Sequence, residues 1–204
     1  MRGGPKRRVY LVGEGPNELG GRANPPPYAR PDELGVLEAL LSRVAPDAFE
    51  VRGARCWSKA TTFKAGGHAS AEARRVMQLH NDAVEADCDV LALARDQDGD
   101  DGRFDSLVRA LADAAQAFPS VEAIAGLAVQ AVEGWLLAVS DVRGSERVKP
   151  RAGKKKIAVA GVACTADMVE LVNGADLDAL PDDATSLRAW LERARKVLGD
   201  DAQL

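Results

Sequence analysis

The chain has 204 residues, of which 46% are apolar and 28% are charged, and its formal net charge is −4. These values fit one well-buried globular domain with a small appendage. They exclude a surface that is basic throughout, although a local basic groove remains compatible with them. No apolar run approaches the roughly 20 residues that span a bilayer, and only a short apolar run follows the basic residues 1–8. We therefore expect no membrane span and no export signal.

The three cysteines, Cys56, Cys88 and Cys164, are far apart in the sequence. Their spacing fits neither a disulfide framework nor a zinc site. We expect three small buried residues in a reducing compartment, which predicts a cytoplasmic protein.

Apolar runs alternate with amphipathic segments over most of the chain. The apolar runs predict strands at residues 8–12, 49–57, 88–94 and 121–129. Between them the pattern predicts a Gly/Pro-rich loop at residues 19–31 and helices that begin at Pro31, Ala69 and Asp105. This alternation predicts an α/β fold with a mostly parallel four-stranded sheet flanked by helices.

The alternation ends after Asp141. Residues 149–156 are rich in lysine and arginine and predict a flexible basic stretch. Two helices are predicted after it, at residues 166–172 and 186–198, with N-caps at Thr165 and at Thr185 or Ser186 and a C-terminal end at Gly199. We therefore divide the chain into a sheet domain, residues 1–142, and a basic linker with a helical appendage on the same domain, residues 143–204.

Acidic residues follow three of the four predicted strands. In an open parallel sheet, ligands bind outside the carboxyl ends of the strands. This rule brings together Glu14 and Glu18 after the first strand, Asp96, Asp98 and Asp100 after the third, and Glu133 after the fourth. Oxygen ligands of this kind suit Mg²⁺ or Mn²⁺, and so many carboxylates would repel one another without a cation. We predict a Mg²⁺ (or Mn²⁺) site at this edge, with one carboxylate available for proton transfer.

The acidic motifs carry a resemblance to a known family. Residues 14–18 (Glu-Gly-Pro-Asn-Glu) and 96–100 (Asp-Gln-Asp-Gly-Asp), each after an apolar strand, resemble the Toprim domain of topoisomerases, primases, the RNase that matures 5S ribosomal RNA and OLD-type nucleases. Residues 133–137 (Glu-Gly-Trp-Leu-Leu) are similar to the Glu-x-Trp-Leu-Leu helix of small standalone Toprim-like proteins. The chain departs from the OLD-like pattern at Asn17, where threonine is common. The resemblance covers roughly residues 8–141.

The resemblance implies a Toprim-like, Rossmann-like fold and a Mg²⁺-dependent nuclease that hydrolyses phosphodiester bonds in DNA or RNA. It makes Glu14, Asp96 and Asp98 the catalytic residues, and the metal ligands are then drawn from Glu14, Glu18, Asp96, Asp98, Asp100 and Glu133. Similar proteins act in prokaryotic anti-phage defence or toxin-like modules, so an ATPase partner subunit is implied, and a homo-oligomer fits as well. Tyr10 and Tyr28 are poorly placed as nucleophiles, which favours hydrolysis over strand passage.

Several basic residues are candidates for contacts with nucleic acid phosphates. They are Lys59, Lys64, Arg103, Lys154 and Lys155. A run of charges is more often simply a solvated surface, and the lysine run has no interleaved aromatic residues that would stack on bases.

Alternatives remain open for both the motif and the function. The aspartate cluster alone also fits the solvated start of a helix. It fits an EF-hand less well, because Asp101 stands where that loop needs glycine. It fits a haloacid-dehalogenase-type phosphatase less well, because that class usually carries Asp-x-Asp on its first strand. The functional alternatives are a non-catalytic Toprim-like subunit that binds metal or nucleic acid and scaffolds an ATPase partner, and a small-molecule phosphohydrolase.

Overall fold

The computed structural model describes residues 5–24, 27–60, 70–97, 100, 102–129 and 132–199. Its centre is a four-stranded sheet in the order β2-β1-β3-β4, and every neighbouring pair is parallel. The strands are β1 (Arg7–Gly13), β2 (Phe49–Cys56), β3 (Val90–Asp96) and β4 (Glu122–Ala128). The predicted α/β class, with a parallel four-stranded sheet flanked by helices, is confirmed.

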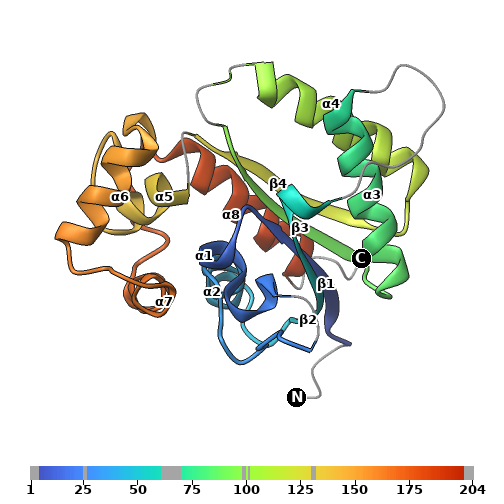
Figure 1. Ribbon diagram of the computed structural model, residues 1–204, viewed down its shortest axis with the longest axis horizontal. Coiled ribbons are helices and arrows are strands. Elements are labelled where there is room, and N and C mark those ends of the chain that lie inside the picture. Colours follow the sequence, from blue (N-terminus) through green and yellow to red (C-terminus); the bar gives the residue numbers. More distant parts are fainter. Residues whose placement is uncertain are drawn as a thin grey trace.

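Both faces of the sheet are covered by helices, which explains the continuous apolar runs in β1 and β3. One face packs against α3 (Ala71–Glu85) and α4 (Gly102–Ala117), and the other packs against α2 (Val36–Val44) and α8 (Thr185–Leu198). Figure 1 shows these two layers on opposite sides of the sheet. Val9 and Leu11 point into one apolar cluster and Val12 into the other, and all three are fully buried.

The strand register brings the acidic motifs to one edge. Val12 of β1 lies opposite Leu93 of β3, and Asp96 at the end of β3 lies opposite Ala128 of β4. Because all four strands run in the same direction, the residues that follow them emerge at the same carboxyl edge. The short helix α1 (Pro16–Leu19) and the 3₁₀ turn η1 (Gly20–Ala23) follow β1 there.

The predicted helix start at Pro31 is wrong, because α2 begins at Val36. The residues before α2 instead form main-chain hydrogen bonds with the segment after β1: the Gly21 N–H donates to the Glu33 carbonyl at 2.8 Å. A Cβ on Gly35 would lie 2.3 Å from the Glu18 carbonyl oxygen, so the chain passes too close to α1 for any side chain at this position. The helix therefore starts only after Gly35.

The predicted flexible stretch at residues 149–156 is also wrong, because it forms the helix α6 (Pro150–Val159). Proline suits the first helical position, and the buried Gly153 and Ile157 face α5 (Val132–Val139). A Cβ on Gly153 would lie 3.3 Å from the Glu133 Cβ, so glycine lets α6 approach α5 closely. Helical contact with α5 thus orders a segment whose composition suggested a linker.

The C-terminal helices α7 (Thr165–Gly174) and α8 confirm the two predicted helices and the end at Gly199. The predicted N-caps are wrong, since Cys164 and Ala184 occupy those positions. Carboxylates supply the capping instead: Asp167 accepts from the Cys164 N–H at 3.0 Å. At α8 the carboxylate comes from Glu146 in the 3₁₀ turn η3 (Ser145–Arg147).

Helix α8 is packed directly on the sheet. Trp190 is fully buried, and its indole N–H donates to the Leu93 carbonyl at 3.0 Å. Gly126 of β4 lies under it, since a Cβ there would be 3.1 Å from the Trp190 ring. Of the cysteines, Cys56 and Cys88 are buried as predicted, whereas Cys164 is exposed. None of the described helices combines the length and apolar character that crossing a membrane requires.

Candidate active site

Four of the predicted acidic residues lie at the carboxyl edge of the sheet on four different elements. Glu14 follows β1, Glu18 lies in α1, Asp96 ends β3 and Glu133 lies in the first turn of α5. The negative charges of Glu14, Glu18 and Glu133 all act on Asp96, which places the four carboxylates near one another. The strand register and the turn after β1 are what assemble this acidic edge.

Glu18 is buried at this edge, with 6% of its surface exposed. Its carboxylate accepts a hydrogen bond from the Gly15 N–H at 2.9 Å, which closes the turn of α1. A Cβ on Gly13 would lie 2.5 Å from the Glu18 Cβ, so glycine at that position makes room for the acid. The pKa of Glu18 is raised to about 7, chiefly by burial and also by the charges of Glu133 and Glu14, while hydrogen bonds from the Glu18 and Gly15 N–H groups oppose the rise.

Asp96 is half-buried and joins β3 to α5. Its Oδ1 accepts from the Val132 N–H, at the start of α5, at 3.1 Å. Its main-chain carbonyl accepts from the Arg103 guanidinium at 2.7 Å. Burial raises the pKa of Asp96 to about 7, with the charges of Glu18, Glu14 and Glu133 adding to the shift.

Glu133 is 4% exposed, and α6 packs over it. The Lys154 ammonium of α6 lies 3.7 Å from Glu133 Oε1, but the lysine side chain is 69% exposed. This ion pair is therefore largely solvated on the lysine side. Helix α6 brings a basic surface to the rim of the acidic edge.

The Glu14 side chain is 31% exposed, and it faces Arg95. The Arg95 Nε lies 3.7 Å from Glu14 Oε1, and the same guanidinium pairs with Glu72 of α3. It also stacks over the ring of Trp57, with its Cζ 4.3 Å from the ring centroid. Trp57 lies in the 3₁₀ turn η2 (Trp57–Lys59) after β2, so this cation is held from three elements.

Arg95, Glu72 and Trp57 were not among the predicted site residues. An arginine at the end of an apolar run, directly before Asp96, is a visible signal in the sequence. Its partners are not visible there. Glu72 lies in α3, and Trp57 follows β2, which β1 separates from β3 in the sheet.

The Asp100 side chain contacts the start of α4 in the structure. Its carboxylate accepts from the Gly102 N–H at 3.1 Å and lies 3.9 Å from the Arg103 guanidinium, and its side chain is 60% exposed. It therefore marks the start of α4. The predicted residues Asp98 and Lys64 lie outside the described residues.

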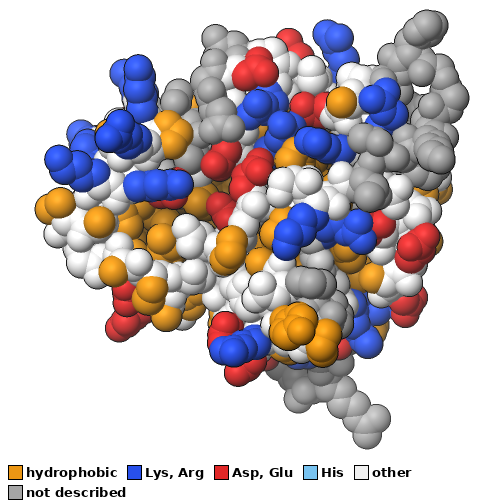
Figure 2. Space-filling view, in the orientation of Figure 1, with side chains coloured by type: hydrophobic (Ala, Val, Ile, Leu, Met, Phe, Trp, Pro, Cys, Tyr) orange, Lys and Arg blue, Asp and Glu red, His pale blue; other side chains and the backbone are white. Residues whose placement is uncertain are grey.

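The described basic residues from the prediction lie on different sides of the edge. Lys154 and Lys155 are exposed on α6, whereas the Lys59 ammonium donates to the Ala23 carbonyl at 3.4 Å. Arg103 lies at the start of α4, where it holds the end of β3. Figure 2 shows acidic side chains in the middle of this face, with basic side chains over α6 on one side and further basic side chains on the other.

The donor set is that of a hard cation, because carboxylate oxygens dominate it. Within the described residues, no three His, Cys, Asp or Glu side chains are arranged as a metal ligand set. Burial is the largest cause of the raised pKa values of Glu18 and Asp96, and repulsion by the neighbouring carboxylates adds to it. A divalent cation would relieve this repulsion, so the chemistry of these residues fits Mg²⁺ or Mn²⁺.

Comparison of the chain with protein-family models, with curated proteins and with solved structures gives no match. The resemblance to Toprim proteins therefore rests on residues 14–18, 96–100 and 133–137.

Proposed function

We propose that the chain is a Mg²⁺-dependent nuclease of the Toprim-like class, which hydrolyses phosphodiester bonds in DNA or RNA. The observation that carries the proposal is the meeting of Glu14, Glu18, Asp96 and Glu133 at the carboxyl edge of a parallel sheet. An acidic edge of this kind, with basic residues on both sides, suits a polyanion whose charge is bridged by a cation.

Asp96, Glu18 and Glu133 are the residues that would hold the cation, because they are the more enclosed carboxylates of the edge. Glu14 and Asp98 complete the proposed set, Asp98 by its position in the motif. A bound Mg²⁺ would supply a water with a lowered pKa and would neutralise charge on the phosphate.

Glu14 is the residue that we propose for proton transfer. It is more exposed than Glu18 and Glu133, and the Arg95 Nε lies 3.7 Å from its carboxylate. The guanidinium itself is kept in position by Glu72 and by the ring of Trp57. Arg95 thus acts as a positioning residue for the proposed acid or base.

Lys154, Lys155 and Arg103 are proposed to bind phosphates beside the acidic edge. The lysines come from α6, and the exposed character of both leaves their ammonium groups accessible to a polyanion. The resemblance also suggests an ATPase partner subunit and a role in anti-phage defence, and it is compatible with a homo-oligomer.

The test is cleavage of supercoiled plasmid, single-stranded DNA and RNA in Mg²⁺ and in Mn²⁺, with and without an ATPase subunit encoded by a neighbouring gene. Asp96→Asn keeps the shape of the side chain and is expected to lower the cleavage rate about 100-fold or more. Asp113→Asn on the exposed side of α4 removes the same charge away from the edge and is the matched control. Equal and negligible cleavage by wild type and Asp96→Asn under every condition overturns the proposal.

A non-catalytic subunit is the second candidate. The observation that favours it is the position of Asp100, which serves the start of α4. Metal binding that is lost in Asp96→Asn, without cleavage of any polynucleotide by wild type, would support this candidate over the nuclease.

A further inference from the structure

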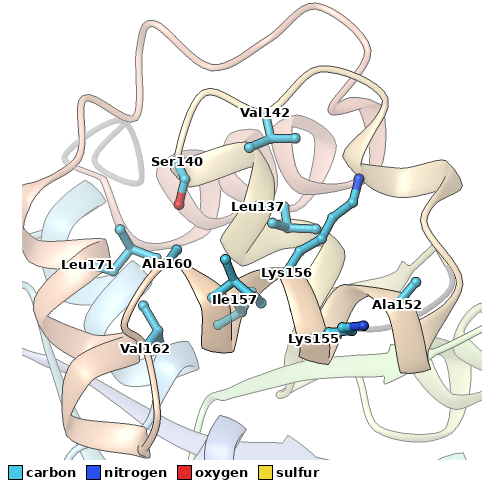
Figure 3. A pocket seen from close by; sticks show the side chains of 11 residues that line it. Leu137, Ser140, Val142, Ala152, Lys155, Lys156, Ile157, Ala160, Val162 and Leu171 are labelled. Carbon is cyan, nitrogen blue, oxygen red and sulfur yellow. The ribbon is translucent and has the colours of Figure 1, made fainter.

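A cavity of about 500 Å³ lies between α5, α6 and α7, away from the acidic edge. Leu137 of α5, Ile157 of α6 and Leu171 of α7 contribute to its lining (Figure 3). Val142 and Val162 add further apolar surface from the connecting segments. The volume is in the range of about 300–1,000 Å³ that is usual for small-molecule sites.

The lining is apolar except for Ser140 and two lysines. The Ser140 hydroxyl donates to the Leu136 carbonyl at 3.0 Å, so its hydrogen is already engaged within α5. Lys155 and Lys156 are exposed residues of α6 that line the cavity. Within the described part of the chain, neither lysine has an ion-pair partner, in contrast to Lys154 beside Glu133.

A neighbouring hollow of about 430 Å³, which shares Ala160, Val162 and Leu171 with the cavity, carries negative charge. Asp167 and Glu170 line that hollow. An anionic group is repelled from these carboxylates and attracted to the lysines. A ligand with one anionic end is therefore oriented, with its head toward the lysine side of the cavity and its apolar body toward Leu171.

The size of the cavity favours a small ligand over a protein partner. Eleven residues line it, whereas a specific protein interface uses about 20–30 residues on each side. We propose that this cavity binds a single-chain amphiphile with a carboxylate head, the apolar chain lying among the three helices. The proposal is independent of the nuclease activity, because it uses none of the four carboxylates at the sheet edge.

Two helices that line the cavity, α5 and α6, also reach the acidic edge. Glu133 and Leu137 are four residues apart on α5, and Gly153 and Ile157 are four residues apart on α6. Residues at this spacing lie on the same side of a helix. The α5–α6 contact thus has Glu133 at one end and the cavity at the other.

The test is to titrate the full chain with dodecanoate, below the critical micelle concentration, and to measure the heat of binding by isothermal titration calorimetry. We expect one saturable site in wild type. The double variant Lys155→Gln/Lys156→Gln is expected to bind roughly tenfold more weakly, because a charge-assisted contact to the head is lost. Ala160→Trp is expected to abolish binding, since residue 160 is exposed and a large ring there can fill the cavity without displacing core residues.

The matched control is Lys149→Gln/Arg151→Gln, which removes the same charge from the first turn of α6, outside the lining. It should bind dodecanoate as wild type does. Dodecylammonium tests the sign of the head group and should bind more weakly than dodecanoate. The proposal is overturned if dodecanoate shows no saturable binding, if Ala160→Trp binds as wild type does while remaining folded by circular dichroism, or if dodecylammonium binds equally well.

Discussion

Two buried glutamates with the same exposed fraction have opposite surroundings. Glu18 and Glu146 are both 6% exposed. Glu146 Oε1 accepts from the Ser186 N–H at 2.9 Å, the Ser186 hydroxyl at 2.6 Å and the Leu187 N–H at 3.2 Å, and its Oε2 accepts from the Thr185 hydroxyl at 3.1 Å. Glu18 receives the main-chain N–H groups of Gly15 and of Glu18 itself, and it also meets the charges of Glu133 and Glu14.

This comparison shows that burial by itself does not identify a functional acid. Donors surround Glu146, so its charge stabilises the start of α8. It also fixes the Ser186 hydroxyl, which accepts from the Trp135 indole N–H at 2.7 Å. Glu18 is buried beside other acids and receives fewer donors, so its charge is a cost to the folded state unless a cation or a proton offsets it. The number of donors around a buried carboxylate distinguishes the structural acid from the candidate ligand.

The largest expected effect is the loss of stability in Glu146→Ala. The substitution leaves the N–H groups of Ser186 and Leu187 without their acceptor at the partly buried start of α8. We expect the free energy of unfolding to fall by roughly 3 kcal/mol, measured by urea denaturation. Glu170→Ala, at an exposed position of α7, is the control and should change stability by less than about 0.5 kcal/mol. Equal losses in both variants would remove the distinction between the two glutamates.

The second effect concerns how stability depends on pH. The pKa values of Glu18 and Asp96 are raised from 4.5 and 3.8 to about 7 in the folded protein. The folded state therefore binds these protons more tightly than the unfolded state, so their contribution to stability is greatest at about pH 4 and is lost as the pH rises through about 7.

The variant Glu18→Gln/Asp96→Asn removes this dependence, because neither side chain can ionise. We expect it to be more stable than wild type at pH 8 by an amount on the order of 2 kcal/mol, and closer to wild type at pH 5. Urea denaturation at both pH values measures the difference, and Asp113→Asn should keep the slope of wild type. A variant that loses as much stability as wild type between the two pH values would contradict the surroundings described for Glu18.

Much of this comparison was accessible from the sequence, and part of it was not. Glu18 could be placed at the sheet edge because apolar strands and the acids that follow them are local patterns, and parallel strands share one carboxyl edge. Glu146 was missed because its donors lie about 40 residues further along the chain, at Thr185 to Leu187. No local spacing links such positions.

The same reason explains the other differences. A run of lysines suggested a flexible linker, whereas the buried Gly153 and Ile157 show that α6 is packed against α5. Arg95 was visible, but its position depends on Trp57, which follows β2, a strand that is not the neighbour of β3 in the sheet. Local chemistry was thus predictable, whereas pairing between distant segments was not.

The smallest expected effect is the response of the two acids to Mg²⁺. At pH 8, a free Mg²⁺ concentration ten times its Kd should stabilise wild type by about 1.4 kcal/mol, because the cation binds the folded acidic edge. NaCl at the same ionic strength is the control for screening. Asp96→Asn should lose the response, while Glu146→Gln should retain it at a lower starting stability, since the donors around Glu146 leave no uncompensated charge for a cation.

Near pH 6 the stabilisation by Mg²⁺ should shrink, because protons compete at groups with pKa values of about 7. Thermal unfolding monitored by fluorescence measures each case, and equal stabilisation of wild type and Asp96→Asn would mean that Mg²⁺ acts elsewhere on the molecule.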